Sequence, residues 1–323
     1  MAYYNDEIKQ KFLESVSSRE VRFKTASALF SALTPYETKL NKDVCAFDKQ
    51  ELDNALGMAF PVRTKSMRAY IGILRDYNKW CICRNVDGAG EAVYDIDPDD
   101  IGLTKIRQQM ISNPQHLQRY LNCIFQPESF RTVQNTYRAR FWLAFAGIEE
   151  EEAILVRASE VRFDLMTIEH DGKSYPIYRE ALKCLHNCVE LNSFAYIHPL
   201  YDKQIERPRS SGDALLRGTG SNGTNMKTMQ TNISREIRMH DWSKESPDIN
   251  IKLSYDKTKL SGIFYRTYEA ERAGIDVDFY AVVDEDMAGK QYTYKTSTHT
   301  SIRNQLERNY ESDYSRWKKA FNI

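Results

Sequence analysis

Basic side chains gather in two stretches of the chain where acidic residues are few. Between residues 57 and 84, six basic residues accompany one acidic residue, Asp76. Between residues 203 and 238, seven basic residues accompany three acidic ones, among Ser, Thr, Asn and Gly that can also bond phosphate oxygens. Such clusters are either ordinary solvated faces or the electrostatic footprint of nucleic-acid binding. The candidate DNA-binding residues are Arg63, Lys65, Arg68, Lys79, Lys173, Arg207, Arg209, Arg217, Lys227 and Arg235.

Other patterns that could carry chemistry are weak. The six cysteines include no paired C-x-x-C and the six histidines lack metal-ligand spacing, so we expect reduced, structural thiols. Residues 218–223 fit G-x-G-x-x-G, but no convincing strand precedes them, as a dinucleotide fold requires. The acidic run 149–152 is better explained as a solvated helix start than as a metal site. We therefore predict no catalytic residues, no metal and no cofactor.

The overall composition is that of an ordinary folded protein with no net charge. Its 323 residues exceed one average domain, so two domains are expected. Forty-five basic residues cancel forty-five acidic ones, and any attraction to nucleic acid must come from local clustering. No stretch reaches about 18 uninterrupted apolar residues, the length that a membrane span needs. We predict a cytoplasmic protein without a membrane partner.

The elements that would position the first basic cluster are helices. Apolar residues recur at helical spacing between residues 7 and 34, and Pro35 should end that helix. Asp48 and Glu51 form a capping-box pattern that opens a short helix, and residues 63–84 form another with one apolar face. Residues 85–104 are predicted as an acidic linker, because 85–100 hold six acidic residues, two glycines and a proline but no Lys or Arg. The first domain is thus helical and spans residues 1–104.

The second domain, residues 105–323, is predicted to be mostly helical with a small β-sheet. Alternating residues 161–168 and 175–178 flank an Asp171-Gly172 turn and predict a hairpin. Residues 202–226 are predicted to be a long polar loop. The predicted helices cover about 113–124, 133–145, 179–191, 226–239, 265–273 and 301–321.

The order of these elements resembles the tyrosine recombinase (phage integrase) family. Residues 43–52 and the helix 66–80, SMRAYIGILRDYNKW, are similar to the third and fourth helices of its core-binding domain. Residues 145–155 are similar to its "TGLRISELLAL" box, and residues 260–274 occupy the place of its "HDLRHTFATRLLEAG" box. The resemblance implies a helical core-binding domain joined to a catalytic-like α+β domain.

The residues that the family uses to cut DNA are missing at the matching positions. Glu149 stands where the first catalytic arginine belongs, and Leu260 and Ile263 replace the H-x-x-R pair. His299 falls where the nucleophilic tyrosine is expected, and Lys173 alone matches a catalytic position. Strand cleavage needs every role filled at once, so we predict that the protein is not an enzyme. The alternatives are an active recombinase with displaced catalytic residues and a protein-interaction module that binds no nucleic acid.

A recombinase scaffold without recombinase chemistry resembles the phage repressors that control lytic genes. That resemblance implies a sequence-specific transcriptional repressor that binds double-stranded operator DNA in the bacterial nucleoid and maintains lysogeny. It identifies no antirepressor or other regulatory protein. Arg63, Lys65 and Arg68 open a helix and are expected to contact bases, whereas Arg207, Arg209, Arg217 and Lys227 lie in or beside the polar loop and are expected to follow phosphates.

Overall fold

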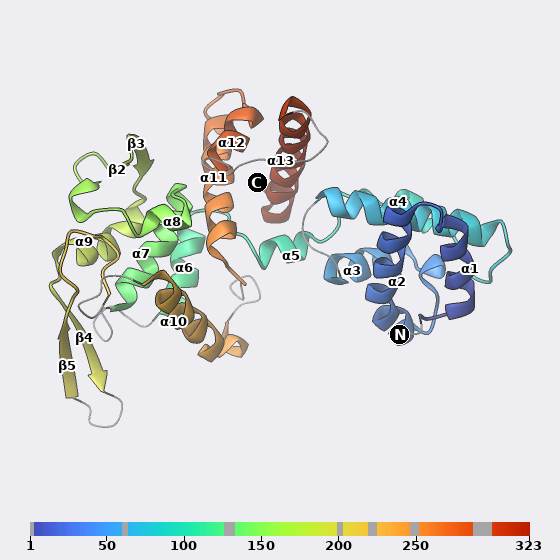
Figure 1. Cartoon of the computed structure of the whole chain (residues 1–323), viewed down its shortest axis with the longest axis horizontal. Coiled ribbons are helices and arrows are strands. Elements are labelled where there is room, and N and C mark those ends of the chain that lie inside the picture. The colour runs from blue at the N-terminus through green and yellow to red at the C-terminus, as the bar shows by residue number, and fades with distance from the viewer. Residues whose placement is uncertain are drawn as a thin grey trace. The chain divides into compact units, whose positions relative to one another are not determined.

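The computed structural model divides the chain into two compact units (Figure 1). Unit 1 combines residues 1–107 with residues 294–323, and unit 2 comprises residues 108–293. The structure describes residues 3–59, 64–125, 133–198, 203–218, 225–245, 252–286 and 299–323. Within these ranges, no helix combines the length and the apolar content needed to cross a membrane.

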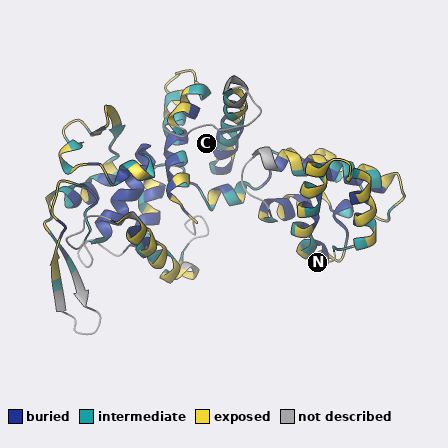
Figure 2. Cartoon of the chain, in the orientation of Figure 1, coloured by how far each residue is buried: buried dark blue, intermediate teal, exposed yellow. Residues whose placement is uncertain are grey.

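Unit 1 is built on four helices around an aromatic core. Phe12, Phe30 and Tyr77 come from three different helices, and the Tyr77 ring lies 5.1 Å from Phe12 and 4.8 Å from Phe30 in edge-on contacts. Figure 2 shows the buried faces of these helices turned toward one another. The helices are α1 (Asp6–Val16), α2 (Glu20–Leu40), α3 (Lys49–Ala59) and α4 (Thr64–Ile82), with a 3-10 turn at Val44–Ala46.

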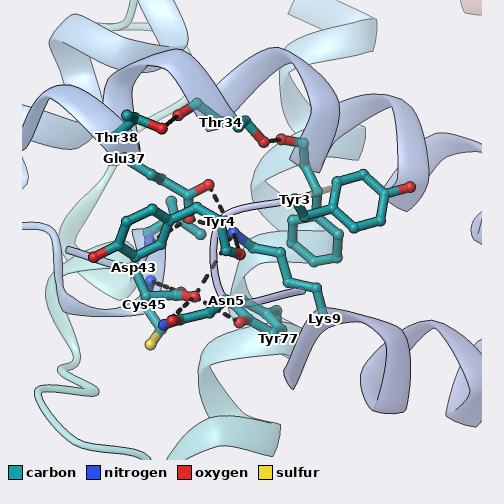
Figure 3. A network of polar contacts seen from close by, with 12 residues as sticks. Tyr3, Tyr4, Asn5, Lys9, Thr34, Glu37, Thr38, Asp43, Cys45 and Tyr77 are labelled. Carbon is teal, nitrogen blue, oxygen red and sulfur yellow. Dashed lines mark hydrogen bonds and ion pairs between the residues drawn. The ribbon is translucent and has the colours of Figure 1, made fainter. Parts of the chain in front are cut away.

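Two local predictions in unit 1 have different outcomes. The capping box is confirmed, because Asp48 and Glu51 each accept a 2.8 Å bond from the other's backbone N–H. The predicted helix end at Pro35 is wrong, since α2 continues through Pro35 to Leu40. Beyond the proline, Glu37 is fully buried and ion-paired with Lys9 of α1, and this contact needs the last turns of α2 to remain helical (Figure 3).

The predicted acidic linker is also wrong, because residues 85–101 pack into unit 1. Val93, Ile96 and Ile101 are buried in its core, and a 3-10 turn forms at Ala92–Asp95. The Arg75 guanidinium of α4 donates to backbone carbonyls of this segment, with a 3.0 Å bond to Ile96. Because apolar anchors alternate with the acidic residues, the carboxylates stay outside while the backbone is fixed.

The chain end also contributes to unit 1. Helix α13 (His299–Phe321) packs on the short helix α5 (Leu103–Arg107) and on α4, with Trp317 fully buried. The buried Arg316 donates a 2.5 Å bond to the Ile101 carbonyl. The sequence predicted a second domain of residues 105–323, whereas the compact units assign residues 294–323, with this C-terminal helix, to unit 1.

Unit 2 is organised around α7 (Val133–Ala146), a helix that is buried along almost its whole length. Helices α9 (Leu182–Glu190) and α11 (Tyr255–Arg272) pack against it. At Gly262 of α11, an added Cβ would lie 1.8 Å from the Phe145 carbonyl oxygen, so only glycine permits this crossing. The other helices are α6 (Pro114–Ile124), α8 (Glu150–Ala153), α10 (Met226–Met239) and α12 (Phe279–Asp286), with 3-10 turns at Ala158–Glu160, Arg179–Ala181 and Trp242–Lys244.

Two small antiparallel sheets complete unit 2. The predicted hairpin turn is confirmed: β2 (Thr167–His170) pairs with β3 (Lys173–Pro176) around Asp171 and Gly172, both at positive φ. The single strand predicted over residues 161–168 is wrong in part, because the chain turns between β1 (Val161–Arg162) and β2, and β1 pairs with β2 as a third strand. The long loop predicted over residues 202–226 is wrong in part, since β4 (Ser193–His198) pairs with β5 (Lys203–Pro208). Ile205 is the only aliphatic side chain of β5, so the strand carries almost no hydrophobic alternation to reveal it.

Candidate nucleic-acid interface

A basic groove in unit 1 lies between the start of α2 and the first half of α4. It is an open groove of about 630 Å³ with a mainly apolar lining, and Arg19, Arg22 and Arg68 line it together with the acidic Glu20. Gly72 leaves the groove open at its α4 side, since an added Cβ would meet no atom within 4 Å. Arginine guanidinium groups are suited to bidentate bonds with phosphate, and in this structure two of the three already contact carboxylates, Arg22 with Asp76 and Arg68 with Asp99. The sequence prediction included Arg68 but missed Arg19 and Arg22, because their proximity to α4 arises only in the fold.

The other candidates of unit 1 differ in how far they can be placed. Lys79 is exposed near the end of α4. Arg63 lies outside the described residues, and Lys65 is described only as a backbone position in the first turn of α4. Arg22 is ion-paired with Asp76 of α4, which links the two walls of the groove.

Helix α10 of unit 2 presents a continuous basic and hydroxyl-bearing face. Met229 and Ile233 are buried and hold the helix to the core, and Asn225 caps its N-terminus by accepting a 3.1 Å bond from the Thr228 N–H. Its exposed positions carry polar side chains at helical spacing, namely Lys227, Thr231, Ser234, Arg235 and Arg238. We call these five residues the α10 face. Lys227 therefore lies on a packed helix rather than in a flexible loop, and Arg238 joins the candidates.

The remaining candidates of unit 2 are dispersed, and one of them is internal. Lys173 is exposed at the start of β3, and Arg207 is exposed on β5. Arg217 is half-buried, with a long 3.5 Å bond to the Leu191 carbonyl. Arg209 is 7% exposed, and its guanidinium donates to the Cys188 and Leu191 carbonyls at 2.6 and 2.8 Å.

Arg209 therefore has a structural role. Its bonds satisfy carbonyls at the C-terminal end of α9, where a cation is also favoured by the helix dipole. Its guanidinium also lies 5.1 Å from the Phe194 ring centroid on β4. We remove Arg209 from the candidate DNA contacts because its donors are turned into the protein.

The region that would correspond to a recombinase active site is occupied by ion pairs. Lys259 is 2% exposed, contacts the Glu149 carboxylate and lies 3.1 Å from Asp286 Oδ1. Arg266 pairs with Glu285 and donates a 2.8 Å bond to the Phe145 carbonyl. Lys259 and Arg266 are thus each paired with at least one carboxylate.

The pKa of one nearby side chain, Tyr175, is raised by the carboxylates around it and by its burial. Burial raises the pKa of Tyr175 on β3, and the charges of Asp171, Glu152, Glu285 and Glu149 raise it further.

Of the other positions aligned with catalytic residues, Ile263 is fully buried, and the His299 side chain lies outside the described residues. Among the described residues, no group of three or more His, Cys, Asp or Glu side chains is placed to hold a metal.

Unit 1 thus presents four packed helices and a groove whose lining includes Arg19, Arg22 and Arg68. Residues 3–83, about a quarter of the chain, match the family model described as "MrpR, N-terminal core-binding domain". The predicted resemblance to phage repressors of the integrase-like family is confirmed, and MrpR is the repressor whose domain this part of the chain resembles. A search of curated proteins finds no match to the chain.

Proposed function

We propose that this protein is a sequence-specific DNA-binding repressor of phage lytic genes that maintains lysogeny. The observation that carries the proposal is the match of residues 3–83 to the MrpR core-binding domain. The groove of unit 1 supports it, because three arginines line one open surface. The partner is double-stranded operator DNA.

The α10 face supplies a second surface suited to DNA, on unit 2. An α-helix fits the major groove of B-DNA, and a helix fixed by buried Met229 and Ile233 can hold the geometry that a base contact needs. We therefore assign Lys227 and Arg235 to contacts that α10 makes from the major groove, with base edges or with phosphates, and Arg207 on β5 to a phosphate contact. Two linked surfaces bind more tightly than either alone, since the second contact becomes intramolecular.

We also propose that the protein neither cuts nor joins DNA. Glu149 in place of an arginine, paired with the buried Lys259, would oppose the negative charge of a phosphodiester transition state. A duplex with a nick near the bound site traps the covalent tyrosyl adduct of an active recombinase. The proposal expects no adduct, and a stable adduct would instead establish the displaced-residue recombinase.

Binding is tested by selecting fragments from a phage genomic library and titrating the selected and random duplexes in mobility shifts. A repressor binds selected fragments more tightly than random ones, and both affinities fall as salt rises. A reporter placed behind the selected fragment then measures repression. Failure to bind DNA at low salt would refute the proposal and favour a protein-interaction module.

A further inference from the structure

We infer that Asp99 is an intramolecular competitor that occupies Arg68 and weakens DNA binding by unit 1. The inference rests on the proposed DNA-binding function. Arg68 lines the groove between α2 and α4, and its Nη2 atom lies 3.4 Å from both carboxylate oxygens of Asp99. A carboxylate and a phosphate engage the same guanidinium donors, so only one of them can hold Arg68 fully.

Asp99 is held in place independently of Arg68. Its Oδ1 atom accepts a 2.9 Å bond from the Ser312 hydroxyl of α13, and its backbone N–H donates a 2.9 Å bond to Asp97. The apolar anchors Ile96 and Ile101 fix the backbone on either side. The carboxylate therefore stays beside Arg68 as a fixed negative charge, a quarter exposed to solvent.

Arg68 is the partner that can move. Its side chain is 53% exposed, and its 3.4 Å bonds are longer than the roughly 2.8 Å of a tight charge-assisted bond. If Arg68 turns to a phosphate, the buried Ser312 hydroxyl loses a long 3.4 Å bond from Arg68 but keeps its 2.9 Å bond to Asp99. The exchange leaves the packing of α13 intact, because Arg316 and Lys319 hold Ile101 and Asp100 separately.

The inference gives Arg68 a phosphate contact in place of the base contact expected from the sequence, so the competition acts equally on every DNA sequence. Arg68 must leave Asp99 before it can neutralise a phosphate, so the attraction to any duplex falls by about one ion contact. Contacts to bases elsewhere on the protein are untouched. Asp99 thus lowers the affinity for random DNA, and a larger share of the binding free energy then comes from contacts that depend on the DNA sequence.

The test measures the affinity of the full chain for a random-sequence duplex by fluorescence anisotropy over a range of salt. Asp99→Asn keeps an oxygen for Ser312 but removes the charge, and should bind about two- to fivefold more tightly, the value of an exposed ion pair. Its salt slope should steepen by about one unit as Arg68 becomes available. Asp95→Asn, an exposed carboxylate of the same segment, is the matched control and should change little.

Arg68→Ala should weaken binding, and adding Asp99→Asn to it should give no further gain. Asp99→Glu should return the affinity toward wild type, and circular dichroism checks that each variant is folded. The inference is overturned if Asp99→Asn matches Asp95→Asn, or if its gain persists without Arg68. Absence of binding by the wild type and all variants would instead remove DNA binding itself, and the inference with it.

Discussion

Removing the Lys9 ammonium should destabilise unit 1 strongly, because it anchors a buried network (Figure 3). Lys9 and Glu37 are fully buried, and the Lys9 Nζ atom lies 2.5 and 2.6 Å from the two Glu37 oxygens. It also donates a 2.8 Å bond to the Tyr4 carbonyl and lies 3.7 Å from Asp43. Lys9→Met keeps an unbranched side chain one atom shorter than lysine and leaves the Glu37 carboxylate without its counterion.

The size of the loss follows from what Glu37 retains. Breaking a buried ion pair on one side costs about 3–5 kcal/mol. Glu37 keeps a 2.8 Å bond from the Val44 N–H, and burial already raises its pKa to about 7 against the opposing effect of Lys9. The carboxyl group can therefore take up a proton near neutral pH, and we expect a loss of about 3 kcal/mol at pH 8.

The same pKa shift gives the pH dependence its sign. A carboxyl group whose folded pKa exceeds its unfolded value contributes stability that is complete below the unfolded value, here 4.5, and is lost as the pH rises through the folded value. Lys9→Met raises the folded pKa of Glu37 further, because Lys9 lowers it. The loss relative to wild type should therefore grow above pH 7, by up to about 1.4 kcal/mol for each pH unit.

Urea unfolding followed by circular dichroism at pH 6.5 and 8.5 measures both effects, and hydrogen–deuterium exchange shows whether α1 and α2 are the parts affected. Lys11→Met is the matched control on the same helix, since Lys11 is 60% exposed and pairs only with an exposed Glu7 among the contacts described. Lys9→Met/Glu37→Gln should recover part of the loss and remove its pH dependence. Equal midpoints for Lys9→Met and Lys11→Met, or equal losses at the two pH values, would refute the reasoning.

Five further substitutions test the fold, the proposed interface and the missing catalytic chemistry. Gly262→Ala should cost about 3 kcal/mol in thermal unfolding because its Cβ has no room, whereas Gly72→Ala in the open groove should stabilise α4 by about 0.5–1 kcal/mol. Arg209→Met should cost about 2 kcal/mol by leaving the α9 carbonyls unpaired, and a change in DNA affinity without a change in stability would contradict that role. Arg235→Ala should weaken DNA binding and flatten the salt slope by about one unit, and an unchanged slope would exclude a phosphate contact. Glu149→Arg alone should not nick supercoiled DNA, since the other catalytic groups are still missing, and nicking would show that the assumed alignment is wrong.

Local patterns allowed several elements to be predicted before any tertiary contact was known. Helix α10 has the predicted bounds 226–239, because Met229 and Ile233 repeat at helical spacing behind the cap Asn225. The Asp48–Glu51 capping box and the Asp171-Gly172 turn depend on residues at most three positions apart. Propensity and hydrogen bonding over such short separations are encoded directly in neighbouring residues.

The features that decide the role of each basic residue depend instead on partners far along the chain. Arg68 contacts Ser312, 244 positions away. Arg209 is buried and donates to carbonyls at the end of α9, whereas Arg207 two positions earlier is exposed. The composition of the acidic segment before residue 101 predicts a linker, but its apolar residues are buried in the core of unit 1. Charge can be counted from a sequence, but whether a charged group faces solvent, a phosphate or a carbonyl depends on long-range packing, which local patterns do not contain.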